Sequence, residues 1–294
     1  MATTRRDILN RLCAVYPLGE ARAVLRLLLE TGFSLTWADV LCGGVEARPP
    51  ASADALETMV ARLEQGEPVQ YVVGEAEFCG RQFRVGRGVL IPRPETELLV
   101  EAALTAALQQ SGAGGISVLD IGTGSGCIAT TMALELEKAK CADGNWTVAG
   151  WDISRDALRI AADNAARLGA GNTTFRQVDI LNRDCADDAR RYSVIVSNPP
   201  YICHRERAGM QRQVVDHEPP EALFVPDDDP LLFYRAITLF ARKALRQGGH
   251  LLFETNRAYA DHTAQLMLRH GFAQVTVSDD QFGNPRIVAG VLDR

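Results

Sequence analysis

The chain has 294 residues, of which 47% are hydrophobic and 23% are charged, a mixture typical of globular proteins. This length accommodates one large α/β domain and a smaller one. The formal net charge of -6 argues against direct, broad binding of nucleic acid. No run approaches the roughly 20 apolar residues of a membrane span, and the first residues lack the apolar segment of a secretion signal. We therefore expect a cytoplasmic protein that binds no membrane.

Seven cysteines are spread along the chain, and no two of them form a Cys-x-x-Cys pair. Their odd number and their spacing argue against both a disulfide framework and a zinc site. The sequence therefore predicts reduced thiols and no bound metal.

The N-terminal part carries helical patterns only. Apolar residues recur every three or four positions from Ile8 to Tyr16 and again from Ala21 to Leu29. After a turn-rich segment, Ser52 is placed to cap a further helix that ends near Leu63. These patterns predict a small helical bundle over residues 1–68.

A different pattern follows. Residues 69–91 alternate around Gly80 and include aromatic and β-branched residues, which predicts a β-hairpin that links two domains. In the next segment, IPRPETE, Pro94 suits the first position of a helix. Glu95 and Glu97 would place negative charge in its first turn, where the helix dipole favours it.

From residue 116 onward, strand and helix patterns alternate. Strands are predicted at 116–121, 147–153, 173–180, 192–201 and 248–255, and a closing hairpin at 272–278 and 285–292. Ser154 and the pair Asp229 and Pro230 are placed to begin helices, and Gly271 to end the last one. Strands that alternate with helices predict a mostly parallel sheet covered on both faces.

Three glycines follow the first of these strands at alternate positions, in the segment Asp120-Ile-Gly-Thr-Gly-Ser-Gly126. Glycine allows a sharp turn and a close approach of a ligand to the backbone. The spacing departs from the GxGxxG fingerprint of dinucleotide-binding folds. The segment resembles motif I of the S-adenosylmethionine-dependent methyltransferases. This resemblance implies that the cofactor lies against Asp120, Gly122, Thr123, Gly124, Ser125 and Gly126.

Two further acids end the next strands. A carboxylate at Asp152 can accept hydrogen bonds from two ribose hydroxyls. Asp179 is placed to accept a hydrogen bond from an adenine amino group, and Ile180 to pack on the ring. Either acid alone is equally compatible with capping the segment that follows it. Because the carboxyl ends of parallel strands form the ligand crevice of an open sheet, the ordered set favours cofactor binding.

The segment Asn198-Pro199-Pro200-Tyr201 ends the fourth strand. Its prolines remove backbone donors, so the loop offers mainly acceptors. The Asn198 side-chain oxygen and the Pro199 carbonyl can each accept a hydrogen bond from one –NH2 group, facing it toward the cofactor's methyl group. Tyr201 can pack flat on a planar group. The motif predicts methylation of a planar nitrogen, but it is compatible with adenine-N6, cytosine-N4 and glutamine-N5 alike.

Several segments together resemble the HemK/PrmC family of peptide-chain release factor N5-glutamine methyltransferases. They are Gln70-Tyr71, Gly74-Glu75, Glu77-Phe78, IPRPETE (91–97), DIGTGSG (120–126), Asp152, SNPPYI (197–202), EPPEAL (218–223) and Glu254. The resemblance implies S-adenosylmethionine as the methyl donor and the glutamine of the GGQ tripeptide of class 1 release factors as the acceptor. It implies an α/β fold, a Rossmann-like class I methyltransferase domain with a mostly parallel seven-stranded sheet and a closing antiparallel hairpin, preceded by a small helical bundle.

The resemblance also divides the chain. Residues 1–68 become a helical release-factor-binding domain, 69–91 a β-hairpin linker and 92–294 the methyltransferase domain. Asn198, Pro199 and Tyr201 become catalytic and, with Pro200, hold the substrate amide, while Arg93 and Glu95 lie near the mouth of the site. Asn198 also faces the cofactor. We expect a monomer.

One segment departs from the family pattern. The family follows the acid of the fifth strand with Gly and Gln, as E-x-G-x-x-Q, whereas this chain reads Glu254-Thr-Asn-Arg-Ala-Tyr259. The departure puts the geometry of this loop in doubt and leaves the chemistry unchanged.

Other functions remain open. A related enzyme that methylates a glutamine of ribosomal protein L3 shares the NPPY motif but normally lacks the PETE form of the preceding segment. An adenine-N6 methyltransferase of nucleic acid would need a basic face, and residues 1–85 carry more acids than arginines. A catalytically silent binding module is disfavoured by the intact Asn198 and glycine loop.

Overall fold

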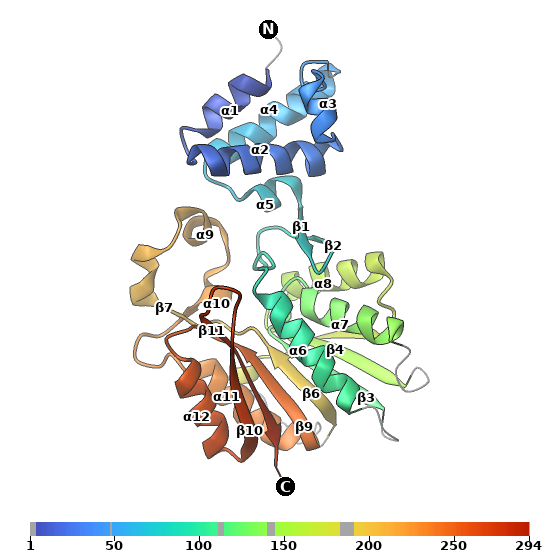
Figure 1. The fold of residues 1–294 in the computed structure, drawn as a ribbon, viewed down its shortest axis with the longest axis vertical. Helices are drawn as coiled ribbons and strands as arrows, with labels where there is room; N and C mark the ends of the chain where they lie inside the picture. Colours follow the sequence, from blue (N-terminus) through green and yellow to red (C-terminus); the bar gives the residue numbers. More distant parts are fainter. Residues whose placement is uncertain (1–3, 48, 111–114, 140–144, 183–190, 294) are drawn as a thin grey trace. The chain divides into compact units, whose positions relative to one another are not determined.

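The computed structural model describes residues 4–47, 49–110, 115–139, 145–182 and 191–293 (Figure 1). The chain divides into two compact units. The helical unit comprises residues 1–76, 85–87 and 210–218, and the sheet unit comprises residues 77–84, 88–209 and 219–294. No helix within the described ranges is long and apolar enough to cross a membrane.

The helical unit is built on an apolar core. Its helices are α1 (Arg5–Leu12), α2 (Leu18–Phe33), α3 (Trp37–Leu41), α4 (Pro50–Glu64), α5 (Val69–Val73) and α9 (Arg212–His217). Thr4 and Thr36 begin α1 and α3 with capping boxes, in which the threonine hydroxyl and an aspartate three residues later satisfy free backbone N–H groups. Ile8, Leu25 and Leu63 are fully or almost fully buried between the helices. The predicted helical bundle is confirmed.

Two predicted details near this unit are wrong. The helix α4 begins at Pro50 and not after Ser52, because a proline at the first helical position already has a suitable φ and no N–H to satisfy. The segment Val69–Val73 is the helix α5 and not a strand, and it ends at Gly74, whose φ of 82° is left-handed. The hairpin is therefore restricted to β1 (Glu75–Phe78) and β2 (Arg81–Arg84).

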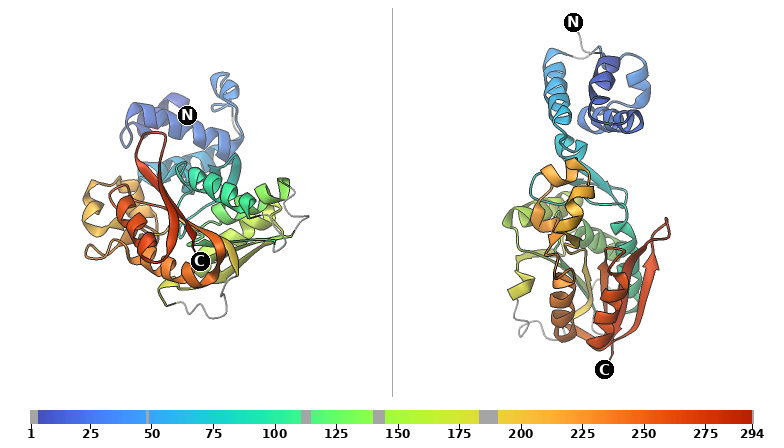
Figure 2. Two further views of the ribbon diagram at one scale, coloured as in Figure 1. Left: turned by 60° about the horizontal axis from the view of Figure 1, so that its bottom comes forward. Right: turned by 90° about the vertical axis from the view of Figure 1, so that its left-hand side faces the viewer.

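The sheet unit contains the predicted seven-stranded sheet, in the order β10-β11-β9-β6-β3-β4-β5. The strands are β3 (Ile116–Ile121), β4 (Trp146–Asp152), β5 (Thr173–Gln177), β6 (Tyr192–Ser197), β9 (Leu245–Glu254), β10 (Phe272–Asp279) and β11 (Pro285–Leu292). The strands from β9 to β5 pair in parallel, and β11 and β10 extend the sheet in antiparallel pairing. Figure 2 shows the closing hairpin of β10 and β11 at one edge of the sheet.

Helices cover both faces of this sheet (Figures 1 and 2). One face packs against α6 (Thr96–Gln109), α7 (Cys127–Lys138) and α8 (Arg155–Leu168), and the other against α11 (Leu232–Ala244) and α12 (Ala260–Arg269). Neighbouring residues of β3 point to opposite faces, so Val118 belongs to the first core and Leu119 to the second. Strands buried on both faces read as apolar runs without alternation, as ISVLDI does.

The helix boundaries of this unit were predicted only in part. Ser154 caps α8 through the Ala157 N–H, and Gly271 comes directly after His270, the C-cap of α12, with a φ of 87°, as predicted. The helix α6 begins at Thr96 and not at Pro94, which lies in the preceding turn.

The helix α11 also begins later than predicted. Its first residue is Leu232, and neither Asp229 nor Pro230 caps it. The Asp229 carboxylate instead forms an ion pair with Arg235 one turn inside the helix. The Asp229 carboxylate is thus paired with Arg235 and accepts no hydrogen bond from the N–H groups at the start of α11.

The described cysteines are Cys13, Cys42, Cys79, Cys127 and Cys203, and each is a free thiol. Cys141 and Cys185 lie outside the described residues.

The contact between the start of α7 and the middle of α8 yields a test of packing. Gly126, which precedes α7, has a φ of 77°, and a Cβ added there would lie 2.8 Å from the Cβ of Ala161. Gly169 has a φ of 82° and open space around it. Gly169→Ala should lower the free energy of unfolding by about 1–2 kcal/mol, from backbone strain alone. Gly126→Ala should lower it by about 1–3 kcal/mol more, because of the added clash.

Urea denaturation of both variants beside the wild type measures these changes. If both variants lose the same free energy of unfolding, α7 and α8 can accommodate the added methyl group and the predicted clash is absent.

Candidate active site

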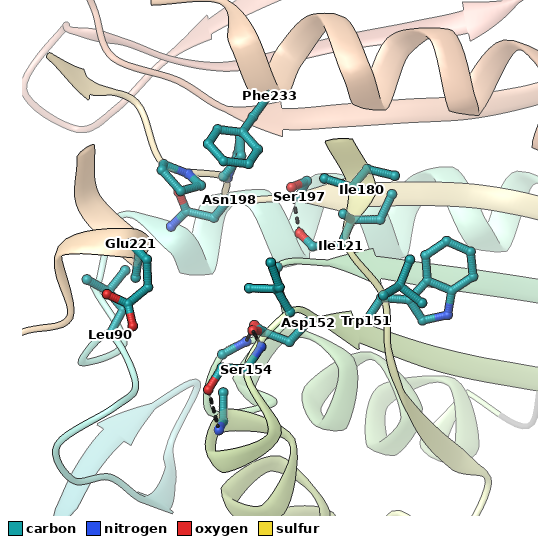
Figure 3. A pocket seen from close by; sticks show the side chains of 18 of the residues that line it. Leu90, Ile121, Trp151, Asp152, Ser154, Ile180, Ser197, Asn198, Glu221 and Phe233 are labelled. Atoms are coloured by element: carbon teal, nitrogen blue, oxygen red, sulfur yellow. Dashed lines mark hydrogen bonds between the residues drawn. The ribbon is translucent and has the colours of Figure 1, made fainter. Parts of the chain in front are cut away.

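A cavity of about 240 Å³ lies at the carboxyl ends of β3, β4 and β6 (Figure 3). Eight of the residues predicted for the site line it: Gly122, Gly124, Asp152, Asp179, Ile180, Asn198, Pro199 and Pro200. These residues lie at or just after the ends of β3, β4, β5 and β6, and the parallel strands bring them together. The structure thus joins the predicted glycine loop and the NPP segment in one cavity.

Asp152 ties the glycine loop to the end of β4. Its Oδ2 accepts a hydrogen bond from the Gly124 N–H at 2.9 Å, and its Oδ1 accepts one from the Ser154 N–H at 2.8 Å. Burial raises the pKa of the Asp152 carboxyl, and these two backbone donors oppose the rise. Each oxygen retains a lone pair, so a ligand hydroxyl in the cavity can still be bound.

Asp120 lies behind the glycine loop and not in the cavity. Its side chain is fully buried, and its Oδ2 accepts hydrogen bonds from the Thr123 hydroxyl at 2.6 Å and the Ala129 N–H at 3.3 Å. Burial raises the pKa of this carboxyl to about 7. Thr123, Ser125 and Gly126 also do not line the cavity. These residues shape the loop and begin α7, while Gly122 and Gly124 face the cavity.

Asp179 and Ile180 lie in the turn after β5 and line the cavity. The Asp179 Oδ1 accepts a hydrogen bond from the Leu181 N–H at 2.9 Å, and its Oδ2 accepts one from the Asn182 side-chain amide at 2.6 Å. Asp179 therefore caps the segment that follows it, as the sequence allowed, and it also lines the cavity.

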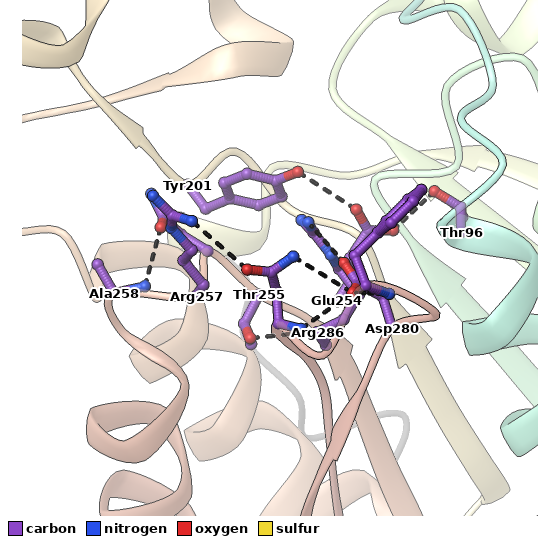
Figure 4. A network of polar contacts seen from close by, with 11 residues as sticks. Thr96, Tyr201, Glu254, Thr255, Arg257, Ala258, Asp280 and Arg286 are labelled. Carbon is purple, nitrogen blue, oxygen red and sulfur yellow. Dashed lines mark hydrogen bonds and ion pairs between the residues drawn. The ribbon is translucent and has the colours of Figure 1, made fainter.

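The NPP segment begins directly after β6. The Ser197 hydroxyl donates a hydrogen bond to the Ile121 carbonyl at 2.6 Å and so joins the ends of β6 and β3. Asn198 lines the cavity and its Nδ2 donates to the Thr96 hydroxyl oxygen at 3.2 Å. Tyr201 does not line the cavity. Its hydroxyl donates to Glu254 Oε1 at 3.2 Å, within the polar cluster shown in Figure 4.

Arg93 and Glu95 lie outside this cavity. Glu95 lines a second cavity together with Cys79, Arg81 and Glu97. Both charges nevertheless act on the polar cluster. Burial raises the pKa of the Tyr201 hydroxyl, and Arg93 opposes part of this rise. Burial also raises the pKa of the Glu254 carboxyl, and Glu95 adds to it.

The segment that departs from the family pattern makes contacts of its own. The Asn256 side chain donates to Glu206 at 3.3 Å and accepts from the Ala258 N–H at 3.0 Å. The Tyr259 hydroxyl lies 2.6 Å from an Arg205 nitrogen that donates to it. Both residues therefore hold the loop that follows the NPPY segment.

Sequence reasoning missed several residues of the cavity wall. They are residues 88–90, Trp151, Ile153, Ser154, Leu181, Glu221, Phe233 and Ile237, among others. Glu221 belongs to EPPEAL, one of the segments that carry the family resemblance, but that resemblance implies no site role for Glu221 itself. Phe233 and Ile237 carry the apolar spacing of an ordinary core helix, so the sequence alone gives no signal for them.

The wall has the composition that a nucleoside-like ligand requires. Ile153 is 55% exposed and Leu181 is 43% exposed, and both line the cavity beside Asp152 and Asp179. Large apolar side chains in this position offer surfaces for a flat ring, and the two carboxylates offer acceptors for hydroxyl and amino groups. These residues fit S-adenosylmethionine, because its adenosine part has a flat ring, hydroxyl groups and an amino group.

The raised pKa of Asp120 has a consequence for stability. The native carboxyl titrates near pH 7, whereas the ordinary value for aspartate is 3.8. The native state therefore holds a proton that the unfolded chain releases above about pH 4. Between pH 4 and pH 7, the free energy of unfolding of the wild type should fall relative to that of Asp120→Asn, by up to about 1.4 kcal/mol per pH unit.

Urea denaturation at several pH values measures this difference. Asp156→Asn, at an exposed position on α8, is the matched control and should show no such trend. Stability curves for Asp120→Asn and the wild type that run parallel from pH 4 to pH 7 would contradict the shift.

Comparison with known proteins identifies the family. Residues 5–74 match the family described as the PrmC N-terminal domain, and residues 113–284 match a methyltransferase domain. The release factor glutamine methyltransferase of Bacteroides thetaiotaomicron is 41% identical over 93% of this chain and 94% of its own. That of Flavobacterium psychrophilum is 35% identical over 97% of this chain and 96% of its own.

Solved structures of methyltransferases are also similar. The release factor-specific protein-(glutamine-N5) methyltransferase of Alicyclobacillus acidocaldarius is 30% identical, covers 72% of this chain and 100% of its own, and has a TM-score of 0.43. A methyltransferase of Pyrococcus furiosus is 17% identical, covers 81% of this chain and 100% of its own, has a TM-score of 0.51, and shares the fold. The methyl donor is S-adenosylmethionine, as the match to the methyltransferase domain implies. Because these two relatives align over nearly the whole of this chain and of their own length, the chain belongs to the family of release factor glutamine methyltransferases.

Proposed function

We propose that this protein transfers a methyl group from S-adenosylmethionine to the side-chain amide nitrogen, N5, of the glutamine in the GGQ tripeptide of a class 1 release factor. One observation carries the proposal. The glycine loop and the NPP segment line one cavity, so a bound methyl donor and the acceptors for an –NH2 group share the same space. The names of the full-length relatives support the choice of a release factor glutamine over adenine or ribosomal protein L3.

The residues that hold the donor follow from the cavity wall. Gly122 and Gly124 present backbone without side chains, Asp152 accepts hydrogen bonds from the ribose hydroxyls, and Asp179 and Ile180 hold the adenine. S-adenosylmethionine supplies a methyl group on a positively charged sulfur. Asp120 and Thr123 do not touch the cofactor in this proposal, and their hydrogen bond fixes the shape of the glycine loop.

The acceptor amide is held by oxygen atoms. The Asn198 Oδ1 and the Pro199 carbonyl accept one hydrogen bond each from the glutamine –NH2, and Pro200 keeps the segment rigid. Both oxygens stabilise the positive charge that grows on the nitrogen as its bond to the methyl carbon forms and the bond from that carbon to sulfur breaks, with S-adenosylhomocysteine as the leaving group. Positioning supplies most of the catalysis, and the nitrogen then releases one proton to water. Tyr201 does not line the cavity, and we assign it to the support of the NPP segment through its hydrogen bond to Glu254, with Arg93 and Glu95 acting on this polar cluster.

The helical unit extends the proposal to the protein partner. We propose that residues 1–68 form a domain that grips the release factor, that 69–91 link it to the rest, and that 92–294 carry the methyltransferase activity. The match of residues 5–74 to a family-specific N-terminal domain supports this assignment. We further propose that the enzyme is a monomer, that it acts in the cytoplasm, and that it makes no direct contact with nucleic acid.

Methyl transfer to a purified release factor tests the proposal. With methyl-labelled S-adenosylmethionine, the wild-type enzyme should label the release factor and leave unlabelled a copy whose GGQ glutamine is alanine. Asn198→Ala should lower kcat by on the order of 10²–10³-fold while the dissociation constant of the cofactor stays unchanged, because one preorganised acceptor is lost.

Three results would contradict this proposal in different ways. Label on both copies would place the target elsewhere in the release factor. Label only on ribosomal protein L3 would change the substrate. A loss of less than a few-fold for Asn198→Ala would remove Asn198 from the catalytic role.

Asp152 is expected to matter for the cofactor. Asp152→Ala removes the proposed ribose acceptor and also the brace of the Gly124 N–H. Hydrogen bonds to a charged group contribute about 1.5–3 kcal/mol, so the dissociation constant of S-adenosylmethionine should rise by roughly 10- to 100-fold in calorimetry. Asp156→Ala, four residues further on and exposed, is the control. Unchanged affinity in Asp152→Ala would move the ribose site elsewhere.

A further inference from the structure

The role of Asn198 depends on which way its side-chain amide faces. Its Oδ1 and Nδ2 are nearly identical in size, but only the oxygen accepts hydrogen bonds. If the amide turned over, an N–H group would face the –NH2 of the substrate, and the two donors would repel each other. Some neighbour must therefore distinguish the two ends of the amide.

Thr96 is that neighbour. Its hydroxyl donates to Glu254 Oε2 at 2.6 Å, and its oxygen lies 3.2 Å from Asn198 Nδ2. A hydroxyl carries a single hydrogen, and here that hydrogen is committed to the carboxylate. The Thr96 oxygen can then only accept a hydrogen bond from Asn198. The Nδ2 end must face Thr96, and the Oδ1 end is left to face away from it.

Glu254 is the fixed end of this chain of hydrogen bonds. Its side chain is 1% exposed, and its two oxygens accept from Thr96 and from the Tyr201 hydroxyl (Figure 4). Burial raises the pKa of the Glu254 carboxyl, and this rise is opposed by the hydrogen bonds from Thr96 and Tyr201 and by the positive charge of Arg286, which pairs with Asp280 at 3.3 Å. One buried carboxylate thus holds both Asn198, through Thr96, and Tyr201 directly.

The backbone positions keep this network rigid. Thr96 is the first residue of α6, and Glu254 is the last residue of β9. The strand β9 pairs with β6 up to Ser197, the residue before Asn198. The distances between the three side chains are therefore set by the sheet and by one helix start, and not by a loose loop.

We propose that Thr96 and Glu254 are positioning residues that orient the Asn198 amide with its oxygen toward the substrate nitrogen. The proposal rests on the proposed function, because only an –NH2 substrate requires an acceptor at this point. Neither residue touches the cavity, and both act through Asn198. Thr96 and Glu254 thus favour a substrate nitrogen that donates two hydrogen bonds, although they lie outside the cavity.

The first test compares two threonines changed to valine, a substitution of equal shape. Thr96→Val should lower kcat for methyl transfer by roughly 10- to 100-fold, because the amide loses the partner that orients it, and should leave the dissociation constant of the cofactor unchanged. Thr238→Val is the control. Thr238 is fully buried in α11, and its hydroxyl has no partner among the described residues, so its kcat should stay within 2-fold, on the order of assay error.

The conservative changes sharpen the comparison. Thr96→Ser keeps the hydroxyl and should retain kcat within about 3-fold. Glu254→Gln should lower kcat about 10-fold, since its amide offers donors where the carboxylate only accepts. Full activity in Thr96→Val, or in Glu254→Gln, would overturn the proposal.

A double-mutant comparison separates orientation from a general structural role. In the Asn198→Ala background there is no amide left to orient, so adding Thr96→Val should cost less than about 2-fold in kcat. Losses that multiply would show that Thr96 acts independently of Asn198, and the proposal would be wrong.

The Asn198 side-chain NH2 signals in a nitrogen-15 NMR spectrum give a readout that needs no substrate. They are identified by their absence in Asn198→Ala, and they should move in Thr96→Val and Glu254→Gln but not in Thr238→Val. Unmoved signals overturn the proposal. If the wild type fails to methylate the release factor, the proposed function is wrong, and this measurement still decides whether the network orients the amide.

Discussion

Parallel strands end at the same edge of a sheet, and the rest of this structure depends on that constraint. The strands β3, β4, β6 and β9 deliver the glycine loop, Asp152, Asn198 and Glu254 to one edge, although these residues are far apart in the chain. Each strand is fixed on both sides by backbone hydrogen bonds. The side chains that follow therefore need only short loops to reach one another, and the polar groups of the site are held by the most rigid part of the molecule.

The parts of the site that could be predicted are those with a local signature. The glycine loop, Asp152 and the NPP segment each follow a strand that is visible as an apolar run, and the rule for carboxyl ends places them together. Phe233 could not be placed, because a cavity wall and a helix core use the same apolar spacing. The hydrogen bond from Thr96 to Glu254 spans 158 residues. Both residues lie in segments that the sequence singles out, but no spacing rule joins them.

Two of the errors in the fold share one physical cause. Local propensity was overruled by neighbours that a single window does not contain. Val69, Tyr71 and Val72 favour a strand by residue type, yet their side chains are buried as a helical turn that Gly74 ends. Asp229 is a good helix cap by type, yet Arg235 takes it as an ion-pair partner. The centre of the sheet was predictable, because β3 and β6 are buried on both faces and their sequences read as mainly apolar runs.

The exposed Ile153 and Leu181 give cofactor binding a distinct thermal character. A ligand that covers them removes apolar surface from water, and burial of apolar surface lowers the heat capacity of the complex. The enthalpy of binding then becomes more favourable as the temperature rises, while the entropy becomes less so. The two changes largely cancel, so the affinity for the methyl donor varies little over the range of temperatures in which the protein stays folded.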